Sequence, residues 1–321
     1  MKAAIRTTYG LPEDLSIQNI VIPTPKDHEV LIRVHATTVN RTDCAILTGK
    51  PYILRLFTGL VKPTLPTPGS DFAGQIEAIG KAVTNFKAGD KVWGFDDNGL
   101  GSQGQYMTLS ANKAIITMPE NCSYAQAAAS AEAAHYAYNF INKVNLKPGQ
   151  KVLVNGATGG IGSAAVQMLV HLGVQVTAVA NTKNLELVQS LGAIRVMDYT
   201  KEDFTRDTEK YDFIFDAVGK STFGKCKHLL KPNGIYISSE LGPGAQNPFL
   251  ALFTPMMGGK KVIFPLPSDI KGSLVYIKNL IELGKFKPVI EREYPLEEIA
   301  EAYRYVASGQ KTGNVVIDLN H

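Results

Sequence analysis

The segment from residue 155 to 162 reads N-G-A-T-G-G-I-G, follows the apolar run 152–154 directly and opens a helical pattern. Glycines at such a turn let the backbone bend tightly and approach a pyrophosphate, which then lies at the positive N-terminus of the helix. A glycine motif alone is weak evidence, but a strand before it, a helix after it and a second strand at Val174 supply the required context. The alternative is a glycine turn that serves only close packing of helix on sheet. We predict a dinucleotide site formed by Ala157, Thr158, Gly159, Gly160, Ile161 and Gly162.

The end of the second strand distinguishes the two nicotinamide cofactors. A site for NAD usually places Asp or Glu there to hold the ribose hydroxyls, whereas this chain has Asn181, Thr182 and Lys183, with no acid before Glu186. Lys183 is suited to pair with a ribose phosphate, and Asn181 and Thr182 are suited to donate to it, by charge-assisted bonds of about 1.5–3 kcal/mol. The pattern therefore favours NADPH over NADH. The alternative for Lys183 is a solvated lysine at a helix start.

The elements around this turn alternate between strand and helix. Strands are expected at 151–154, 174–180, 195–197, 211–215 and 234–238, and helices at 161–172 and 185–191. Such alternation indicates βαβ units and a parallel sheet. Before it, short β-like runs at 29–34, 74–79 and 91–95 indicate a mostly antiparallel first part, followed by a helix at about 123–144 with Ser123 as its N-cap. Helices at 272–283 and 296–308 and an isolated strand at 315–317 complete the pattern.

Composition limits the class of protein. The 321 residues are 45% hydrophobic and 19% charged, which argues against disorder and predicts about two domains. The net charge of +4 comes without any basic block, so neither nucleic acid nor a membrane is expected as the main partner. Three cysteines at wide spacing exclude a disulfide framework, and the absence of a leader-like apolar run predicts a cytoplasmic setting.

Several ordered motifs carry a resemblance over the whole chain. They are V-N-R-T-D at 39–43, P-G-S-D-F-A-G at 68–74, G-D-K-V-W-G-F at 89–95, the glycine turn, D-Y-T at 198–200, F-D-A-V-G at 215–219, Y-P-L-E at 294–297 and G-N-V-V at 313–316. With them the chain resembles the medium-chain dehydrogenase/reductase superfamily. It is most similar to the zinc-free quinone oxidoreductase branch, with its alkenal-reductase and reticulon-interacting relatives.

The resemblance implies an α/β protein of two domains. A GroES-like, β-rich substrate domain is expected at 1–122 and 266–321, and a doubly wound Rossmann domain with a parallel sheet at 123–265. The isolated strand at 315–317 would return to the first domain. Family members often form homodimers edge to edge, for which residues 261–264 are a candidate strand unless that strand is interior. The segment 249–257 is expected to form either an apolar wall for the substrate or the dimer interface.

The resemblance also bears on metal chemistry. Zinc alcohol dehydrogenases of this superfamily have a Cys, a His-Glu pair and a further Cys where this chain has Asn40, Ser70-Asp71 and approximately Ala133. Asn and Ser are poor zinc ligands, so no metal is expected. His135 is interpreted as an ordinary helix residue. Reduction of a quinone or an α,β-unsaturated carbonyl needs no metal, because the charge spreads onto oxygen and hydrogen-bond donors can stabilise it.

The remaining site residues are assigned by the same resemblance. Asn40 is predicted as a donor near the substrate oxygen or the nicotinamide ribose, with a structural turn amide as the alternative. Tyr52 and Tyr136 are candidate catalytic tyrosines, although the family often has a tyrosine at Ala45 and a threonine at Tyr136, which leaves the proton donor unassigned. Three further residues are predicted to contact the cofactor: Tyr199 beside the ribose phosphate, and Val218 and Gly219 along the nicotinamide ribose.

These expectations converge on one activity. The sequence predicts a zinc-independent, NADPH-dependent reductase of quinones or of the C=C bond of enals and enones. Two alternatives stay open: a binding protein that holds NADPH as a sensor, structural or partner-binding component without turnover, and a reductase of enoyl thioesters.

Overall fold

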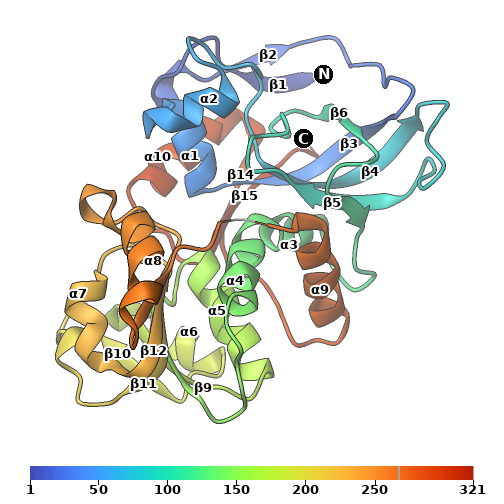
Figure 1. Ribbon diagram of the computed structural model, residues 1–321. Helices are drawn as coiled ribbons and strands as arrows, with labels where there is room; N and C mark the ends of the chain where they lie inside the picture. The colour runs from blue at the N-terminus through green and yellow to red at the C-terminus, as the bar shows by residue number, and fades with distance from the viewer. Residues whose placement is uncertain (267, 321) are drawn as a thin grey trace. The chain divides into compact units, whose positions relative to one another are not determined.

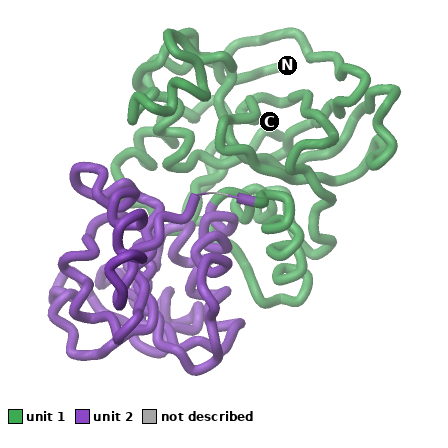
Figure 2. Tube along the Cα trace, in the orientation of Figure 1, with its two compact units in different colours: residues 1–132, 269–321 green, residues 133–268 purple. Residues whose placement is uncertain are grey.

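The computed structural model describes residues 1–266 and 268–320. The chain divides into two compact units, which Figure 2 colours separately: unit 1 comprises residues 1–132 and 269–321, and unit 2 comprises residues 133–268. The domain boundaries predicted after residues 122 and 265 stay predictions.

Unit 1 is built on a largely antiparallel sheet of seven strands in the order β14-β15-β3-β4-β5-β7, in which β6 also pairs with β3 (Figure 1). The isolated C-terminal strand lies inside this sheet, between β14 and β3. A separate hairpin-like pair joins β1 and β2. The strands are β1 (Lys2–Ile5), β2 (Ser16–Asn19), β3 (Glu29–Val39), β4 (Asp71–Ile79), β5 (Lys91–Phe95), β6 (Tyr106–Ser110), β7 (Ile115–Thr117), β14 (Ile290–Pro295) and β15 (Asn314–Asp318).

Local capping explains where the helices of unit 1 begin and end. The Asn40 side chain accepts from the Asp43 N–H at the start of α1, and Gly49 ends that helix in the left-handed region. Ser123 caps α3 in a capping box with Gln126, as predicted. The helices of this unit are α1 (Arg41–Thr48), α2 (Arg55–Thr58), α3 (Tyr124–Ala129), α9 (Ile270–Glu282) and α10 (Ile299–Ala307), and its 3-10 turns are η1 (Pro12–Asp14), η2 (Tyr52–Leu54) and η7 (Leu296–Glu298).

Unit 2 contains a six-stranded, wholly parallel sheet in the order β10-β9-β8-β11-β12-β13. Most residues of its central strands are buried, and Leu153, Ile214 and Tyr236 belong to one apolar core. The strands are β8 (Lys151–Asn155), β9 (Gln175–Ala180), β10 (Arg195–Asp198), β11 (Tyr211–Asp216), β12 (Leu230–Ser238) and β13 (Lys261–Ile263).

The helices of unit 2 connect these strands. They are α5 (Gly160–His171), α6 (Leu185–Ser190), α7 (Phe223–Cys226) and α8 (Gln246–Met257), with 3-10 turns η3 (Thr182–Asn184), η4 (Phe204–Arg206), η5 (Lys227–Leu229) and η6 (Pro243–Ala245). Helix α4 (Glu132–Asn142) begins at the last residue of unit 1. The two units together confirm the predicted α/β class, with an antiparallel-rich sheet and a parallel sheet.

Two element predictions were wrong in detail. The single helix expected at 123–144 is two helices, because the chain breaks at Ser130, whose hydroxyl donates to the Gln126 carbonyl one turn earlier. Strand β12 begins at Leu230 rather than at Gly234. Its first half contains Pro232 and Asn233, the latter at φ 63°, so this part has the composition of a turn.

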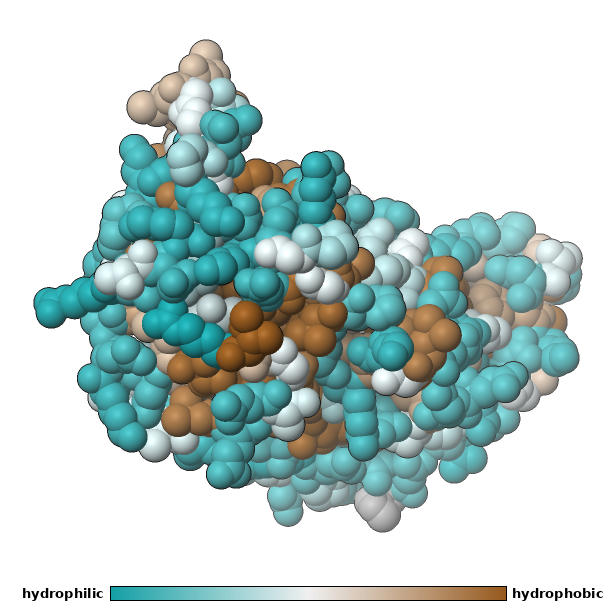
Figure 3. All heavy atoms as spheres, turned by 90° about the horizontal axis from the view of Figure 1, so that it is seen from below, coloured by the Kyte–Doolittle hydropathy of each residue, from teal (hydrophilic) through white to brown (hydrophobic). Residues whose placement is uncertain are grey.

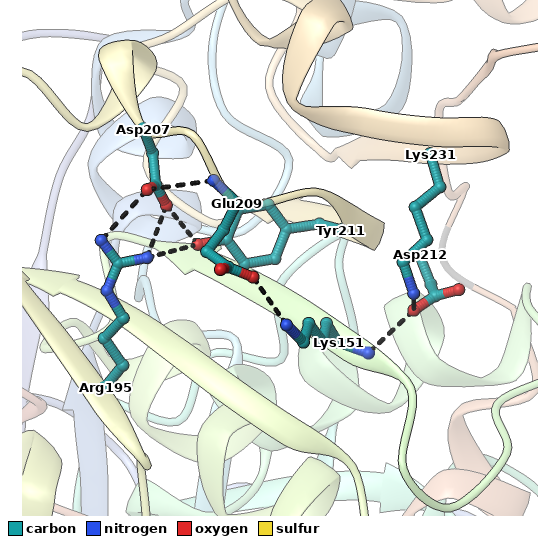
Figure 4. Close-up of polar contacts among 7 residues, drawn as sticks. All are labelled: Lys151, Arg195, Asp207, Glu209, Tyr211, Asp212 and Lys231. Atoms are coloured by element: carbon teal, nitrogen blue, oxygen red, sulfur yellow. Dashed lines mark hydrogen bonds and ion pairs between the residues drawn. The ribbon is translucent and has the colours of Figure 1, made fainter.

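The N-terminal ends of β8, β10 and β11 meet at one edge of the parallel sheet and carry a set of paired charges, shown in Figure 4. Arg195 binds Asp207 through both nitrogens at 2.7 and 3.0 Å, and the Tyr211 hydroxyl donates to the same carboxylate at 2.5 Å. Lys151 pairs with Glu209 at 2.6 Å. We call these five residues the edge network. They are among the residues that line a cavity of about 280 Å³.

Polar side chains cover much of the surface seen from below in Figure 3, with apolar groups between them. Within residues 1–266 and 268–320, no helix has both the length and the apolar character that crossing a membrane requires. The cytoplasmic setting stays a prediction.

Candidate active site

The glycine turn between β8 and α5 has the steric requirements that its sequence suggests. Gly156 has φ 78°, and a Cβ there would lie 2.7 Å from the Val218 side chain. A Cβ on Gly162 would lie 2.1 Å from the Gly156 carbonyl oxygen. These two glycines therefore permit the turn and the close packing of α5 against it.

Gly159, at the start of the helix, faces open space. Gly159 is the N-cap of α5, and a Cβ there would have only the Gly156 oxygen nearby, at 3.7 Å. The first N–H groups of an α-helix have no partner within the helix, so this end offers donors to an anion. The predicted residues from Ala157 to Gly162 all lie in this turn, and their arrangement fits the pyrophosphate of a dinucleotide.

Asp216 at the end of β11 organises the neighbouring loop. Its buried carboxylate accepts from the Asn155 amide at 3.0 Å, from the Gly219 N–H at 3.0 Å and from the Tyr236 hydroxyl at 2.6 Å. Val218 and Gly219 are thus held next to the glycine turn, as their predicted role requires. Sequence reasoning missed Asp216 and Asn155, although a polar residue at the end of each of two buried strands was a usable signal.

The end of β9 carries the residues predicted to choose the cofactor. Asn181, Thr182 and Lys183 form and precede the turn η3, and Lys183 is exposed. The structure adds an acid that the sequence argument overlooked: Asp198 of β10 pairs in register with Ala180 and accepts from the Thr182 hydroxyl at 2.5 Å. That bond is the main reason why the pKa of Asp198 lies below its usual value. An acid therefore lies beside this strand end, supplied by the next strand.

Tyr199 follows Asp198 and is 55% exposed. Residues 199–204 line a cavity of about 390 Å³, so Tyr199 and Lys201 both contribute to its wall. The Lys201 ammonium lies 3.8 Å from the Asp198 carboxylate. The surroundings of the predicted ribose-phosphate site thus contain Lys183 and Lys201 as cations and Asp198 as a carboxylate.

Asn40 lies in unit 1, where its amide makes contacts at both ends. Its oxygen accepts from the Asp43 N–H at 2.8 Å, and its nitrogen donates to the Ser70 hydroxyl at 2.9 Å and to Asp71 at 3.3 Å. These bonds agree with the alternative interpretation, a structural turn amide. A substrate that used the Asn40 nitrogen would have to replace Ser70 or Asp71 as its acceptor.

Three buried acids of unit 1, Asp43, Asp71 and Glu132, form what we call the buried acid cluster; none is more than 7% exposed. Burial raises the pKa of Asp71 to about 6 despite the bonds that Thr38 and Thr37 donate to its carboxylate. Burial, and then the charge of Asp71, raises the pKa of Asp43. The same two causes raise the pKa of Glu132 to about 7. Acids whose pKa values are raised in this way are typical of functional sites.

The two candidate tyrosines lie in different units. Tyr52 of unit 1 is 68% exposed, and the Arg55 guanidinium lies 5.0 Å from the centre of its ring. Tyr136 of unit 2 is half-buried on α4 beside His135, which is fully buried and bonded to Asn139. His135 is therefore a helix core residue, as predicted. Unit 1 holds Asn40 and Tyr52, whereas unit 2 holds Tyr136 and every predicted cofactor residue.

Comparison with known proteins identifies the family. The family described as alcohol dehydrogenase GroES-like domain matches residues 26–120, and the family described as zinc-binding dehydrogenase matches residues 191–317. A quinone oxidoreductase of Pongo abelii is 32% identical over 99% of this chain and 97% of its own length. The chain belongs to the quinone oxidoreductase branch of the medium-chain dehydrogenase/reductase superfamily.

Other members of the superfamily extend this result. A 2-methylene-furan-3-one reductase of Solanum lycopersicum and an NADPH-dependent alkenal/one oxidoreductase of Arabidopsis thaliana are each 31% identical over 99% of this chain and 79% of their own length. Among solved structures, the quinone oxidoreductase from Coxiella burnetii superposes with a TM-score of 0.86 at 25% identity, covering 100% of this chain and 99% of that one. The chain is thus an oxidoreductase of this type.

One of the two matched families is described as zinc-binding, but the positions of the zinc ligands hold other residues in this chain. Asn40, Ser70 and Asp71 bond to one another or to neighbouring backbone, and Ala133 has no ligating atom. Within the described residues, no group of three or more His, Cys, Asp or Glu side chains is placed to hold a metal ion. The donors at these positions do not fit a catalytic zinc ion, which prefers thiolate and imidazole.

Proposed function

We propose that this oxidoreductase uses NADPH, without zinc, to reduce quinones or the C=C bond of α,β-unsaturated carbonyls. The observation that carries the proposal is the combination of a glycine turn that fits a dinucleotide with zinc positions that hold no thiolate and no imidazole, but the amide of Asn40, the hydroxyl of Ser70 and the carboxylate of Asp71. The relatives named quinone oxidoreductase and alkenal/one oxidoreductase support the same substrate class. Conjugated acceptors suit such a site, because the charge that develops on oxygen needs donors rather than a metal.

The residues of the chain have separate tasks in this proposal. The turn from Ala157 to Gly162 binds the pyrophosphate, and Val218 and Gly219, held by Asp216, contact the nicotinamide ribose. When bound, the reduced nicotinamide supplies the hydride. The protein contributes orientation, hydrogen-bond donors and exclusion of water from the substrate. Asn40 as a donor near the substrate, and Tyr52 and Tyr136 as candidate catalytic residues, stay predictions of the same scheme.

The choice of NADPH rests on opposing charges. Lys183 and Lys201 favour a ribose phosphate, whereas the Asp198 carboxylate disfavours it. That carboxylate accepts a hydrogen bond from Thr182 and lies 3.8 Å from the Lys201 ammonium. Two cations against one engaged carboxylate favour NADPH. The Lys183→Ala variant should raise the KM for NADPH about tenfold or more and leave the KM for NADH nearly unchanged, since one charge-assisted bond contributes about 1.5–3 kcal/mol. Exposed Lys287 provides a matched control as Lys287→Ala. Equal effects on both cofactors would reject the assignment.

The main experiment tests turnover directly. Purified protein treated with a chelator should oxidise NADPH in the presence of a quinone, an enal or an enone, and product analysis should show the hydroquinone or the saturated carbonyl. Enoyl thioesters belong in the same panel, since faster turnover of them would favour an enoyl-thioester reductase. Activity only after zinc is added would reject the metal-free mechanism. Tight NADPH binding without turnover of any acceptor would favour a sensor or structural role.

We also propose a homodimer formed through unit 2. Strand β13 is an edge of the parallel sheet, and its Val262 N–H donates to Thr254 of the adjoining helix α8. That helix exposes a large apolar surface formed by Phe249, Leu252, Phe253, Met256 and Met257. A second copy related by a two-fold axis would cover both the strand edge and these side chains. Phe253→Asp should shift the protein from dimer to monomer in light scattering, whereas Val21→Asp, at another exposed apolar position, should not. A monomeric wild type would reject the proposal.

A further inference from the structure

Glu132 is a buried acid that is hydrogen-bonded to a partly exposed side chain. The residue is 7% exposed, and its Oε1 accepts from the Thr42 hydroxyl at 3.0 Å. Within the described residues, Thr42 is the one side chain that hydrogen-bonds to Glu132. Among these residues, no arginine binds the Glu132 carboxyl through two nitrogens, as Arg195 binds Asp207. A buried acid without such a cation tends to keep its proton.

The charges around Glu132 have both signs. Asp71 and Asp97 oppose its ionisation, while Lys311 favours it. Lys311 is itself shielded from solvent, donates to the Gly313 carbonyl at 2.6 Å and has Cys44, Glu291 and Arg41 as further charged or titratable neighbours. Burial lowers the pKa of this lysine. The two acids therefore raise the proton affinity of Glu132, and the one cation lowers it. The resulting pKa of about 7 suits a group that exchanges protons at neutral pH.

Thr42 connects this carboxyl to a more accessible part of unit 1. It lies in the first turn of α1, two residues after Asn40, and its side chain is only partly buried. A hydroxyl donates one proton and accepts others, so it can pass a proton on while taking up another. Glu132 and Thr42 thus form a two-residue path from a buried acid to the loop that the proposed function places near the substrate.

We propose that Glu132 supplies, through the Thr42 hydroxyl, the proton that completes reduction of the substrate. The inference rests on the proposed function. Hydride addition to the β-carbon reduces the enone by two electrons as the nicotinamide is oxidised, and the electron pair of the C=C bond moves to give an enolate. For this transfer the Thr42 hydroxyl turns from the Glu132 carboxyl toward the enolate, and the protonated carboxyl of Glu132 donates to the Thr42 oxygen. Thr42 then gives its hydroxyl proton to the enolate and takes the Glu132 proton. Glu132 is left as a carboxylate near Lys311, and a proton from water restores the acid. Glu132 acts through Thr42 and is therefore a positioning residue.

The first test measures the carboxyl group without cofactor or substrate. Infrared titration of the whole protein should show a protonated carboxyl band that disappears as the pH rises through about 7. The band should be absent in Glu132→Gln and present in the control Glu120→Gln, which changes an exposed acid of the same unit. Lys311→Met should move the midpoint to higher pH, because it removes the charge that stabilises the carboxylate. An unchanged band in Glu132→Gln, or a lower midpoint in Lys311→Met, would overturn the inference.

The second test measures proton delivery. In the wild type, kcat for enone reduction should fall as the pH rises through about 7, because the acid form is required. Glu132→Gln should lower kcat by about 100-fold and remove this pH dependence, in line with the usual contribution of general acids. Thr42→Val should act similarly, and Thr42→Ser should restore most of the rate. If Glu132→Gln does not fold, the Thr42 pair and the Lys311→Met titration decide the outcome.

Turnover and proton delivery can be distinguished by experiment. A wild type that reduces no acceptor overturns the proposed function and with it the delivery of a proton, while the infrared titration still reports whether Glu132 holds one. A wild type that is active, with a pH profile unchanged in Glu132→Gln, overturns the delivery alone.

Discussion

The edge network of unit 2 and the buried acid cluster of unit 1 show two ways to place carboxylates in one chain. Burial pushes the pKa of Asp207 upward, but the bonds from Arg195 and Tyr211 outweigh burial and leave the pKa below its usual value. Asp71 is bonded mainly by neutral hydroxyl, amide and backbone groups, and its pKa is raised to about 6. A carboxylate held by a guanidinium keeps its charge and stabilises structure, whereas one surrounded by neutral donors retains a proton.

The largest expected effect tests the structural side of this comparison. Asp207→Ala removes the two-nitrogen contact with Arg195 and the acceptor of the Tyr211 hydroxyl. We expect the free energy of unfolding to fall by about 2–3 kcal/mol in urea titrations, because charge-assisted bonds are lost and a buried hydroxyl loses its acceptor. The KM for NADPH should not change, since the network lies at the opposite ends of the strands from the glycine turn. A variant as stable as the wild type would remove the distinction between the two regions.

The next effect tests the acid cluster through pH. Asp71 keeps its proton up to about pH 6 in the folded protein but only to about pH 3.8 when unfolded. The folded state therefore binds more protons in this window, so the free energy of unfolding decreases as the pH rises from about 4 to about 6. Asp71→Asn should reduce this decrease by about 2 kcal/mol. Chemical unfolding at several pH values provides the measurement, and an identical slope in wild type and variant would contradict it.

The smallest effect sharpens the comparison within the edge network itself. Lys151 and Glu209 form a 2.6 Å ion pair, but their side chains are 41% and 48% exposed. Exposed ion pairs contribute little, because solvent screens them. Glu209→Gln should leave the unfolding midpoint unchanged within error, in contrast to Asp207→Ala. A large loss would show that the five residues act as one unit.

Much of the fold was readable from local patterns. The glycine turn, the buried strands and the capping residue Ser123 depend on neighbours close in sequence, so each was predicted close to its observed limits. The first half of β12 and the helix break at Ser130 were missed because backbone and side-chain bonds overrode composition there.

The candidate site was harder to predict. Asp198 lies beside Thr182 only because β10 pairs with β9, and Glu132 meets Thr42 across 90 positions of sequence. A one-dimensional reading of the acid expected after the second strand could not find an acid supplied by the third. The proton-holding character of Glu132 likewise depends on burial and on Asp71 and Lys311, which no spacing rule connects.

The position of β15 between β14 and β3 has a consequence for folding. Val39 pairs with Val315, so the sheet of unit 1 stays incomplete until the whole of unit 2 has been synthesised. Unit 2 is continuous in sequence and, by contrast, has all of its strands available earlier. Pairings this distant in sequence form slowly and leave strand edges exposed in the meantime. During synthesis, β3 must therefore wait for a neighbour that is made only after unit 2, and nascent unit 1 is exposed to aggregation for that time.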